Sequence, residues 1–298
     1  MFPRPFDYFS PKNLGEALEL YGGAAEVKIL AGGQSLIPAL KLRLFSLKGV
    51  VDMTGIKELG YIRKDGPLLK IGALTTTAAL ENDRAIVSSV PILSEAAEQI
   101  ADPLVRNMGT IGGNLCHAHP ANDLPAVMLA LNASMVATST GRTRKISADS
   151  FFIDSFKTAL KPEEILIGIE IPLQMGRFGS TYRKVRKGSG GFSIAGVAAC
   201  LSASDDDIIT GCRIAMTAVG ATALRAEKAE QKLLGRVPTA SVLDNVARLA
   251  VEASRPSTDS NASEDYRRTV LNKLVKEAVR AAYDRAARGG DGNHEDKV

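Results

Sequence analysis

Two pairs of adjacent glycines constrain the fold and the chemistry of this chain more than any other feature. Gly32 and Gly33 follow the short apolar run Val27–Leu30, which is typical of a strand, and helical spacing begins soon after them. Gly112 and Gly113 form a second turn of this kind. Glycine adopts positive φ readily and leaves its N–H group uncovered, so such a turn can direct several amides at one anion, usually a phosphate. Two of these turns could together hold the two phosphates of a dinucleotide.

The residues beside each glycine pair add hydrogen-bonding groups. Gln34 and Ser35 follow the first pair, and Thr110 and Asn114 flank the second. Neither segment has the Gly-x-Gly-x-x-Gly spacing of a Rossmann nucleotide site or the Walker spacing of a P-loop, so neither kind of site is supported. Taken singly, each pair is better explained as an ordinary tight turn. Their joint occurrence favours an anion site.

The composition is that of an ordinary soluble protein. The 298 residues are 45% hydrophobic and 23% charged, and 37 basic against 33 acidic side chains give a net charge of +4. This length predicts two domains, and the charge balance excludes a disordered or fibrous chain and indicates no nucleic-acid surface. The three cysteines, Cys116, Cys200 and Cys212, are too few for an even disulfide framework or for a four-thiolate iron–sulfur cluster.

The chain shows no targeting or membrane segment. Its amino terminus lacks the apolar run of a signal peptide, and no stretch reaches the roughly 18 apolar residues of a membrane span. Three cysteines that cannot all pair fit a reducing compartment. We therefore expect a cytoplasmic protein.

The order of the apolar runs predicts an α+β protein in two domains. Short strand-like runs alternate with helical spacing as far as Gln174–Arg177, where a boundary is expected. Three strand-like runs then follow in succession, which predicts a three-stranded antiparallel sheet, and helices close the chain. We expect domains at residues 1–176, with lobes of about 1–54 and 55–176, and at 177–288, followed by a disordered tail at 289–298.

Several helix limits can be predicted from capping residues. A first helix is expected to begin at Ser10 with the following proline and to end at Gly22. The run Leu124–Leu131 is apolar enough for a buried helix. The last helix should be capped by Ser263 and stopped by Gly289.

The flanks of the glycine pairs resemble a known family. Residues 31–38, Ala-Gly-Gly-Gln-Ser-Leu-Ile-Pro, and residues 100–114 are similar, almost word for word, to the two flavin-binding segments of the medium subunit of molybdenum hydroxylases. The likeness is strongest for the carbon monoxide dehydrogenase flavoprotein branch and extends to the flavin domain of xanthine dehydrogenase. It covers essentially the whole chain, including Phe6–Tyr8, Asn122–Ala126, Glu164–Pro172 and Tyr182–Ala199.

The resemblance implies a two-lobed FAD-binding domain of the PCMH (vanillyl-oxidase-like) type and a small C-terminal domain. By position, residues 31–36 and 110–114 would hold the FAD pyrophosphate, Asp123 would contact the nucleotide, and Lys184 would approach the flavin from the C-terminal domain. Phe192 stands where carbon monoxide dehydrogenases have a tyrosine near the ring, so the hydroxyl of that tyrosine is missing here. The implied cofactor-binding residues are Ala31, Gly32, Gly33, Gln34, Ser35, Leu36, Ile100, Thr110, Ile111, Gly112, Gly113, Asn114, Asp123, Leu166, Lys184 and Phe192.

Some of these residues also have an ordinary structural interpretation. Asp123 stands at a predicted helix start and could cap it, Lys184 belongs to a basic run that could be a solvated strand face, and Leu166 could be plain core. Cys116-His117-Ala118-His119 suggests a metal site, but this spacing is not that of zinc ligands and no second cluster exists, so no metal is predicted. His117 or His119 is expected to line the nucleotide site instead.

No catalytic side-chain constellation is present, and the flavin would supply the redox chemistry. The resemblance implies an electron-transfer subunit of a heterotrimeric dehydrogenase, as a dimer of heterotrimers. A large subunit with a molybdopterin cofactor would oxidise the substrate, and a small subunit with 2Fe–2S clusters would pass electrons to this FAD and on to an external acceptor. Carbon monoxide, N-heteroaromatics such as nicotine or quinoline derivatives, and aldehydes remain open as substrates.

Two other functions remain open at this point. One is a self-sufficient flavin oxidase of the PCMH type, which would need its own substrate pocket and usually a larger second domain. The other is a flavin-sensing or structural subunit that binds flavin without electron transfer.

Overall fold

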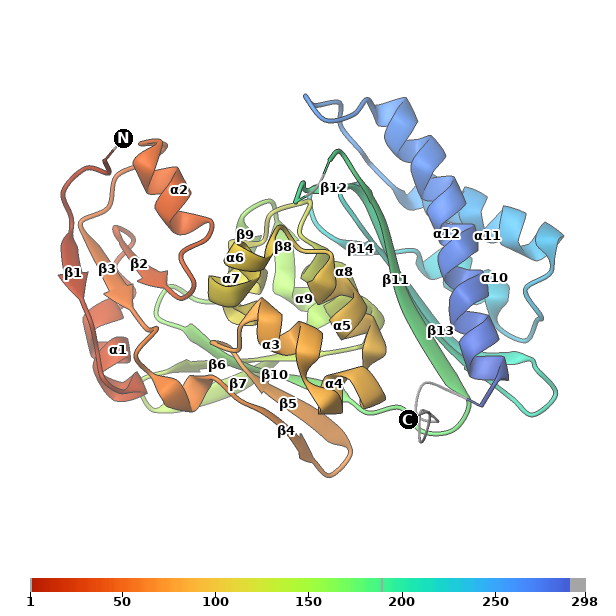
Figure 1. Cartoon of the computed structure of the whole chain (residues 1–298), viewed down its shortest axis with the longest axis horizontal. Helices are drawn as coiled ribbons and strands as arrows, with labels where there is room; N and C mark the ends of the chain where they lie inside the picture. Colours follow the sequence, from red (N-terminus) through yellow and green to blue (C-terminus); the bar gives the residue numbers. More distant parts are fainter. Residues whose placement is uncertain (1, 189, 290–298) are drawn as a thin grey trace.

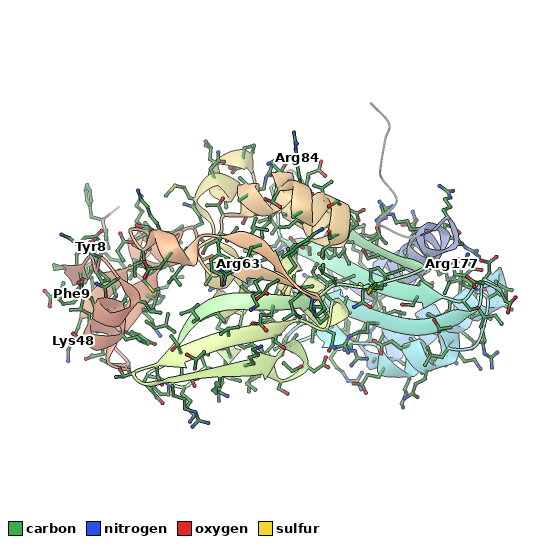
Figure 2. All side chains as sticks on the ribbon, turned by 90° about the horizontal axis from the view of Figure 1, so that it is seen from below. Tyr8, Phe9, Lys48, Arg63, Arg84 and Arg177 are labelled. Carbon is green, nitrogen blue, oxygen red and sulfur yellow. The ribbon has the colours of Figure 1, made fainter. Side chains whose placement is uncertain are left out.

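A computed structural model describes residues 2–188 and 190–289. In this part of the chain, three main sheets follow one another along the sequence (Figure 1). The first is parallel and three-stranded, the second is antiparallel and five-stranded, and the third is antiparallel and four-stranded. This mixture of separate sheets and helices confirms the predicted α+β class. In Figure 2, Tyr8 and Lys48 of the first sheet region lie at one end of the molecule and Arg177, which precedes the third sheet, lies toward the other.

The first sheet is built from three short strands joined by helices. Its strand order is β1-β3-β2, and both pairings are parallel. Parallel neighbours need crossover connections, and α1 and α2 supply them. The elements are β1 (Asp7–Phe9), α1 (Leu14–Tyr21), β2 (Val27–Leu30), α2 (Leu36–Lys41) and β3 (Gly49–Asp52).

The predicted start of the first helix is wrong. Helix α1 begins at Leu14, and its N-cap is Asn13, whose side chain accepts a hydrogen bond from the Glu16 N–H. Ser10 follows strand β1 directly and takes no part in the helix. The predicted end is confirmed, since Gly22 adopts a left-handed φ of 50° as the C-cap.

The second sheet lies at the centre of the molecule and has β10 as its middle strand, in the order β4-β5-β10-β6-β7. The hairpin of β6 and β7 was not predicted, because its strands are rich in serine, threonine and arginine and have little apolar alternation. The strands are β4 (Ile62–Asp65), β5 (Leu68–Gly72), β6 (Ser134–Ser139), β7 (Arg142–Ser147) and β10 (Ile165–Pro172).

Short helices fill the space between the second and third sheets (Figure 1). Helix α8 is buried at all eight positions, which confirms the predicted buried helix. A small hairpin of β8 (Phe152–Asp154) and β9 (Lys157–Thr158) follows α9, and the 3-10 turn η1 (Lys57–Leu59) precedes β4. The helices are α3 (Thr77–Asn82), α4 (Arg84–Ser89), α5 (Pro91–Glu98), α6 (Pro103–Met108), α7 (Ile111–His117), α8 (Asp123–Ala130) and α9 (Ala148–Phe151).

The third sheet is covered on both faces. Its three long strands were predicted, and a two-residue fourth strand, β14, extends the sheet. In β12, Val197 packs with the C-terminal helices, whereas Ala198 packs with the central helices. The elements are β11 (Phe178–Arg186), β12 (Ser193–Ala203), β13 (Ile209–Thr217), β14 (Leu224–Arg225), α10 (Glu227–Leu233), α11 (Ala240–Ala253) and α12 (Glu264–Ala287).

The last helix follows its predicted limits closely. Ser263 caps α12 by accepting a hydrogen bond from the Tyr266 N–H, and Gly289 follows it with a φ of 110°. The rest of the predicted tail lies outside the described residues. No helix in the described part of the chain combines the length and the apolar character that a membrane crossing requires.

Candidate functional site

The two glycine segments, which lie far apart in the sequence, are in direct contact. A Cβ atom placed on Gly32 would lie 2.0 Å from the Met108 carbonyl oxygen and 2.7 Å from the Cα of Gly109. A Cβ on Gly113 would lie 3.6 Å from the Cβ of Ala31. Gly32 is therefore required by the close approach of two backbones, and the predicted convergence of the segments is present in the fold.

The first segment leaves its backbone amides free. Gly33 has a φ of 72°, and its carbonyl accepts a hydrogen bond from the Ile37 N–H at the start of α2. Within the described residues, no N–H group from Gly32 to Leu36 donates a hydrogen bond. A cavity of about 420 Å³ lies against this segment and is also lined by Lys41, Asp52 and Met108. The Asp52 carboxylate already accepts hydrogen bonds from Tyr8 and Thr54, so the free amides and Lys41 are the groups of this cavity that attract an anion.

The prediction for the second segment is wrong in one respect. Gly112 and Gly113 lie in the first turn of helix α7 and do not form a glycine turn with positive φ. A Cβ on Gly112 would lie 2.7 Å from both the Cβ and the carbonyl oxygen of Ala73, so this glycine allows α7 to pack against the end of β5. The amides of this segment are already used: those of Ile111 and Gly112 bond to the carbonyls of Thr75 and Ala73, and those of Gly113 and Asn114 bond to Thr110.

Asn114, in contrast, carries an unsatisfied polar atom. Its side-chain Oδ1 is buried and has no hydrogen-bond partner among the described residues. Its backbone carbonyl accepts a hydrogen bond from the Asn122 Nδ2 at 2.9 Å, which holds the loop after α7 in place. A buried oxygen without a partner destabilises a protein by about 1–3 kcal/mol. A bound group that donates a hydrogen bond to Asn114 would remove this penalty.

Asp123 joins the central helices to the third sheet. Its carboxylate accepts hydrogen bonds from the Tyr182 hydroxyl, from the Ser193 hydroxyl at 2.6 Å and from the Lys184 Nζ at 2.8 Å. Burial, and then the negative charge of Asp123, raise the pKa of Tyr182 well above its ordinary value.

These contacts exclude the ordinary structural interpretations of Asp123 and Lys184. The N-cap of α8 is Asn122, so the interpretation of Asp123 as a helix cap is wrong. The Lys184 side chain is 1% exposed, so the solvated-face interpretation is wrong as well. Tyr182 and Ser193 were missed by the sequence analysis, although Tyr182 lies two residues before Lys184 on β11 and therefore shares its face.

The two apolar site residues lie in or beside the central core. Leu166 is 5% exposed and belongs to the same core as Ile71 and Ile169, as the plain-core interpretation expects. Ile100 is partly buried against that core. It precedes Ala101, whose φ of 46° is rare for an alanine.

Four aromatic rings gather where α7 ends. The rings of His119 and Phe192 stack with centroids 4.4 Å apart and an interplanar angle of 18°. His117 stacks on His119 at 5.8 Å, and Phe156 lies 5.3 Å from both histidine rings. Phe156, which the sequence analysis missed, comes from the turn between β8 and β9. The only feature of the sequence that could have pointed to Phe156 is the presence of an aromatic residue in a turn.

Backbone strain is concentrated around these rings. Ala118, Phe156 and Ala218 all have positive φ, between 47° and 63°. They are held by their neighbours: the Phe156 N–H donates to the Ala118 carbonyl at 2.9 Å, and the Ala218 N–H donates to the Pro120 carbonyl at 2.9 Å. Strained backbone of this kind persists where the surrounding structure fixes it, and it is frequent at binding sites.

The cysteine and histidines of this loop do not form a metal centre. In residues 2–188 and 190–289, no group of three histidine, cysteine, aspartate or glutamate side chains is placed to hold a metal ion. Burial raises the pKa of the Cys116 thiol to about 12, which favours the neutral thiol near neutral pH. Burial also lowers the pKa of His117 and His119, which favours neutral rings.

Family models match both parts of the chain. Residues 4–174 match a model described as the FAD binding domain in molybdopterin dehydrogenase. Residues 180–282 match the CO dehydrogenase flavoprotein C-terminal domain.

Individual relatives and solved structures cover nearly the whole chain. The carbon monoxide dehydrogenase medium chain of Hydrogenophaga pseudoflava is 37% identical over 96% of this chain and 100% of its own length. The 6-hydroxypseudooxynicotine dehydrogenase complex subunit alpha of Paenarthrobacter nicotinovorans is 34% identical over 96% of this chain and 97% of its own. Among solved structures, carbon monoxide dehydrogenase from H. pseudoflava superposes with a TM-score of 0.93 at 37% identity, covering 95% of this chain and 99% of that one. Quinoline 2-oxidoreductase from Pseudomonas putida 86 gives 0.90 at 30% identity, covering 96% and 100%.

Proposed function

This chain belongs to the family of FAD-binding medium subunits of molybdenum hydroxylases, and from this premise we propose its function. We propose that it transfers electrons through FAD within a heterotrimeric dehydrogenase. The observation that carries the proposal is the free run of backbone amides from Gly32 to Leu36, which lies against the Met108–Gly109 backbone and beside a cavity. The second segment predicted to hold the pyrophosphate, residues 110–114, is less suitable, because the amides of Ile111, Gly112, Gly113 and Asn114 already donate hydrogen bonds within the protein.

The residues present fit FAD in three ways. The amides of residues 32–36 and the Lys41 ammonium would bind the pyrophosphate, because both are attractive to a phosphate dianion. Asn114 would satisfy its orphaned Oδ1 by accepting a hydrogen bond from the cofactor. Leu36, Ile100, Leu166 and Phe192 would supply apolar contacts.

Asp123 and Lys184 would tune the electrostatics of the site. Their ion pair is buried at the junction of α8 and β11, so it is screened little by solvent and presents a fixed dipole rather than a net charge. When bound, FAD supplies the electron-accepting and electron-donating chemistry, and the protein binds it, orients it and excludes water from it.

The proposal includes the division of labour among subunits. With three cysteines, this chain cannot hold the iron–sulfur clusters, so a small 2Fe–2S subunit would deliver electrons and a large molybdopterin subunit would oxidise the substrate. That substrate would be carbon monoxide, an N-heteroaromatic compound or an aldehyde, and the electrons would leave to an external acceptor. We further propose a cytoplasmic dimer of heterotrimers, with the FAD domain at residues 1–176 and the C-terminal domain at 177–288.

The substitution Asn114→Leu tests the cofactor site. Leucine has nearly the shape of asparagine but no oxygen, so removing an unsatisfied buried atom should leave the stability of the FAD-free chain unchanged or raise it. FAD affinity should fall about tenfold, equivalent to about 1.4 kcal/mol, because one hydrogen bond is lost. Fluorescence titration of the FAD-free chain with FAD measures the affinity, and urea unfolding measures the stability.

Asn82→Leu is the matched control. Asn82 ends α3 and bonds its own helix through the Ala78 carbonyl, away from the predicted site residues. Its replacement should leave FAD affinity unchanged. Equal FAD affinity of Asn114→Leu and the unchanged chain would remove Asn114 from the site, and a chain that purifies without FAD in complex with its partners would overturn the proposed function. Substrate oxidation by the isolated chain with oxygen would favour the self-sufficient oxidase.

A further inference from the structure

The segment from Ile100 to Gly109 joins two parts of the proposed cofactor site. Ile100 is a predicted apolar contact of FAD, and an apolar side chain suits the ring system of the cofactor better than its charged diphosphate. At the other end, the backbone of Met108 and Gly109 lies against Gly32, in the glycine segment that would hold the diphosphate. The groups that fix the shape of this segment therefore set the spacing between the ring system and the diphosphate.

Helix α3 holds the second end of this segment. The Gly109 carbonyl accepts a hydrogen bond from the Thr77 N–H at 2.8 Å and another from the Thr77 hydroxyl at 3.2 Å. Thr77 is the first residue of α3, and Glu81 lies one turn later on the same face of the helix. The Glu81 carboxylate accepts a hydrogen bond from the Arg106 Nε at 2.8 Å. One face of one helix thus holds both Gly109 and Arg106.

Arg106 extends this support to the first end of the segment. Its Nη1 donates a hydrogen bond to the Ile100 carbonyl at 3.2 Å, while its Nε stays bonded to Glu81. The side chains of Arg106 and Glu81 are 13% and 23% exposed, so solvent screens their ion pair less than it screens a surface pair. A planar guanidinium presents its donors in a fixed fork and can hold a carboxylate and a carbonyl together. Arg106 therefore connects α3 to Ile100.

A second arginine reaches the neighbouring carbonyl from the third sheet. Arg186, the last residue of β11, donates from its Nη1 to the Gln99 carbonyl at 3.0 Å. Two successive carbonyls, those of Gln99 and Ile100, are therefore held by arginines from different parts of the fold. The residue that follows them, Ala101, has a φ of 46°, and such a backbone conformation persists only where its surroundings fix it.

This turn leaves one backbone donor free. Ala101 is half-buried, and its N–H donates no hydrogen bond to any residue in the described part of the chain. The N–H belongs to the same peptide group as the Ile100 carbonyl, and in a planar trans peptide the C=O and N–H groups point in opposite directions. When Arg106 fixes the carbonyl, it also fixes the direction of the N–H. An acceptor on a bound group would satisfy this donor.

We propose that Arg106, supported by Arg186, is a positioning residue for the cofactor: it holds the peptide between Ile100 and Ala101 so that the free N–H donates to the ring end of FAD. The inference rests on the proposed function, since it concerns the same cofactor site. It separates two tasks within that site. The amides of residues 32–36 bind the diphosphate, and Arg106 places the ring system.

The test compares FAD with ADP, which carries the diphosphate but no flavin, in titrations of the FAD-free full chain. In Arg106→Met, FAD affinity should fall about tenfold, because the peptide between Ile100 and Ala101 is no longer held. ADP affinity should change by less than about twofold, because α3 still holds Gly109. Arg106→Lys keeps a charge for Glu81 but loses the fork, so it should recover part of the FAD affinity. Fluorescence measures FAD binding, and calorimetry measures ADP binding.

Arg213→Met is the matched control. Arg213 also joins a carboxylate, that of Asp149, to a backbone carbonyl, that of Leu129, and none of the three is a predicted site residue. Its replacement should leave both affinities unchanged. Arg186→Met is a second test variant that keeps Arg106 in place, and it should lower FAD affinity about threefold.

Equal FAD affinity of Arg106→Met and the unchanged chain would overturn this inference alone. An equal loss of FAD and ADP affinity would overturn it too, since that result indicates a general distortion of the site. If Arg106→Met does not fold, unchanged FAD affinity in Arg186→Met overturns the inference. An unchanged chain that binds neither FAD nor ADP would refute the proposed function itself, and this inference with it.

Discussion

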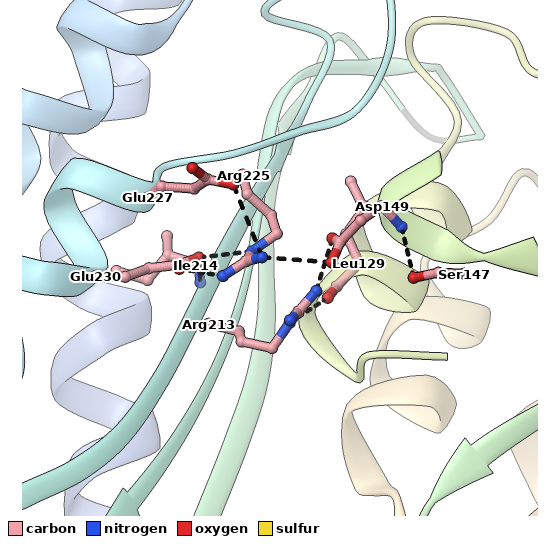
Figure 3. Close-up of polar contacts among 8 residues, drawn as sticks. All are labelled: Leu129, Ser147, Asp149, Arg213, Ile214, Arg225, Glu227 and Glu230. Atoms are coloured by element: carbon pink, nitrogen blue, oxygen red, sulfur yellow. Dashed lines mark hydrogen bonds and ion pairs between the residues drawn. The ribbon is translucent and has the colours of Figure 1, made fainter. Parts of the chain in front are cut away.

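Two polar clusters join the third sheet to the central helices, and each is centred on one aspartate. The inner cluster is built on Asp123, whose side chain is 7% exposed, and its cation, Lys184, is 1% exposed. The outer cluster is built on Asp149 in α9, whose side chain is 38% exposed (Figure 3). Both clusters connect the same two layers, so comparing them shows how one kind of junction behaves when it is buried and when it is exposed to solvent.

The inner cluster depends on a single carboxylate. Tyr182, Lys184 and Ser193 all donate to Asp123. Removing this acid would leave the Lys184 charge buried without the counter-ion that balances it. Because desolvation makes an unpaired buried charge expensive, the whole cluster depends on Asp123.

The outer cluster shares its contacts among several groups. Figure 3 shows Arg213 and Arg225 both directed at Asp149. Arg213 bonds Asp149 at 2.7 Å and also the Leu129 carbonyl at 2.8 Å, while Arg225 lies 3.4 Å from Asp149 and also pairs with Glu230. Each arginine thus keeps a partner if Asp149 is lost. Exposure and this redundancy together predict a small contribution from Asp149.

The largest expected effect follows from Asp123→Asn. This change leaves a buried ammonium without its counter-ion, and we expect a loss of about 3–5 kcal/mol in the free energy of unfolding of the FAD-free chain. Urea unfolding followed by circular dichroism measures it. The measurement is made without FAD because Asp123 is also a proposed cofactor contact.

The double variant Asp123→Asn with Lys184→Met separates charge from shape. Removing the ammonium together with its partner should recover a large part of the lost stability, because the penalty comes from the unpaired charge. A double variant as unstable as Asp123→Asn alone would contradict this account. A single variant that loses less than about 1 kcal/mol would contradict the comparison between the clusters.

Tyr182→Phe should have an intermediate effect. The buried hydroxyl bonds a charged carboxylate, and such bonds contribute about 1.5–3 kcal/mol. Tyr283→Phe is the matched control, because its hydroxyl, in a residue that is 7% exposed, bonds the neutral Asp207 carbonyl. That variant should lose about 0.5–1.5 kcal/mol. Thermal unfolding of the two proteins side by side measures the difference, and equal losses would show that the charge of Asp123 adds nothing.

The inner cluster also shows which contacts could be predicted from the sequence and which could not. Asp123 and Lys184 were singled out by resemblance, but their bond to each other was not predicted, because it joins α8 to β11 across the core. Such a contact leaves no trace in a local window of sequence. Period-two alternation on β11 could have linked Tyr182 to Lys184, since alternate strand residues share a face.

The glycine segments illustrate the same limit for backbone groups. The first segment was predicted correctly as a turn after a strand, because an apolar run followed by two glycines is a local signal. The second became the start of α7, and its amides bond to Ala73 and Thr75, which lie about one supersecondary unit earlier in the chain. Whether an amide is free depends on tertiary partners. The buried helix α8, by contrast, was predictable because every residue from Leu124 to Ala130 is apolar.

Asp149→Asn gives the smallest expected effect and tests the wet side of the comparison. Exposed ion pairs contribute about 0.2–1 kcal/mol, and here both arginines keep second partners. Salt should abolish even this difference, since the screening length falls from about 10 Å at 0.1 M to about 3 Å at 1 M. Urea unfolding at the two sodium chloride concentrations measures it, with Asp123→Asn as the buried reference whose loss should persist in high salt. If Asp149→Asn lowers the free energy of unfolding by more than about 2 kcal/mol, or if salt leaves the loss unchanged, the outer cluster is as well shielded from solvent as the inner one.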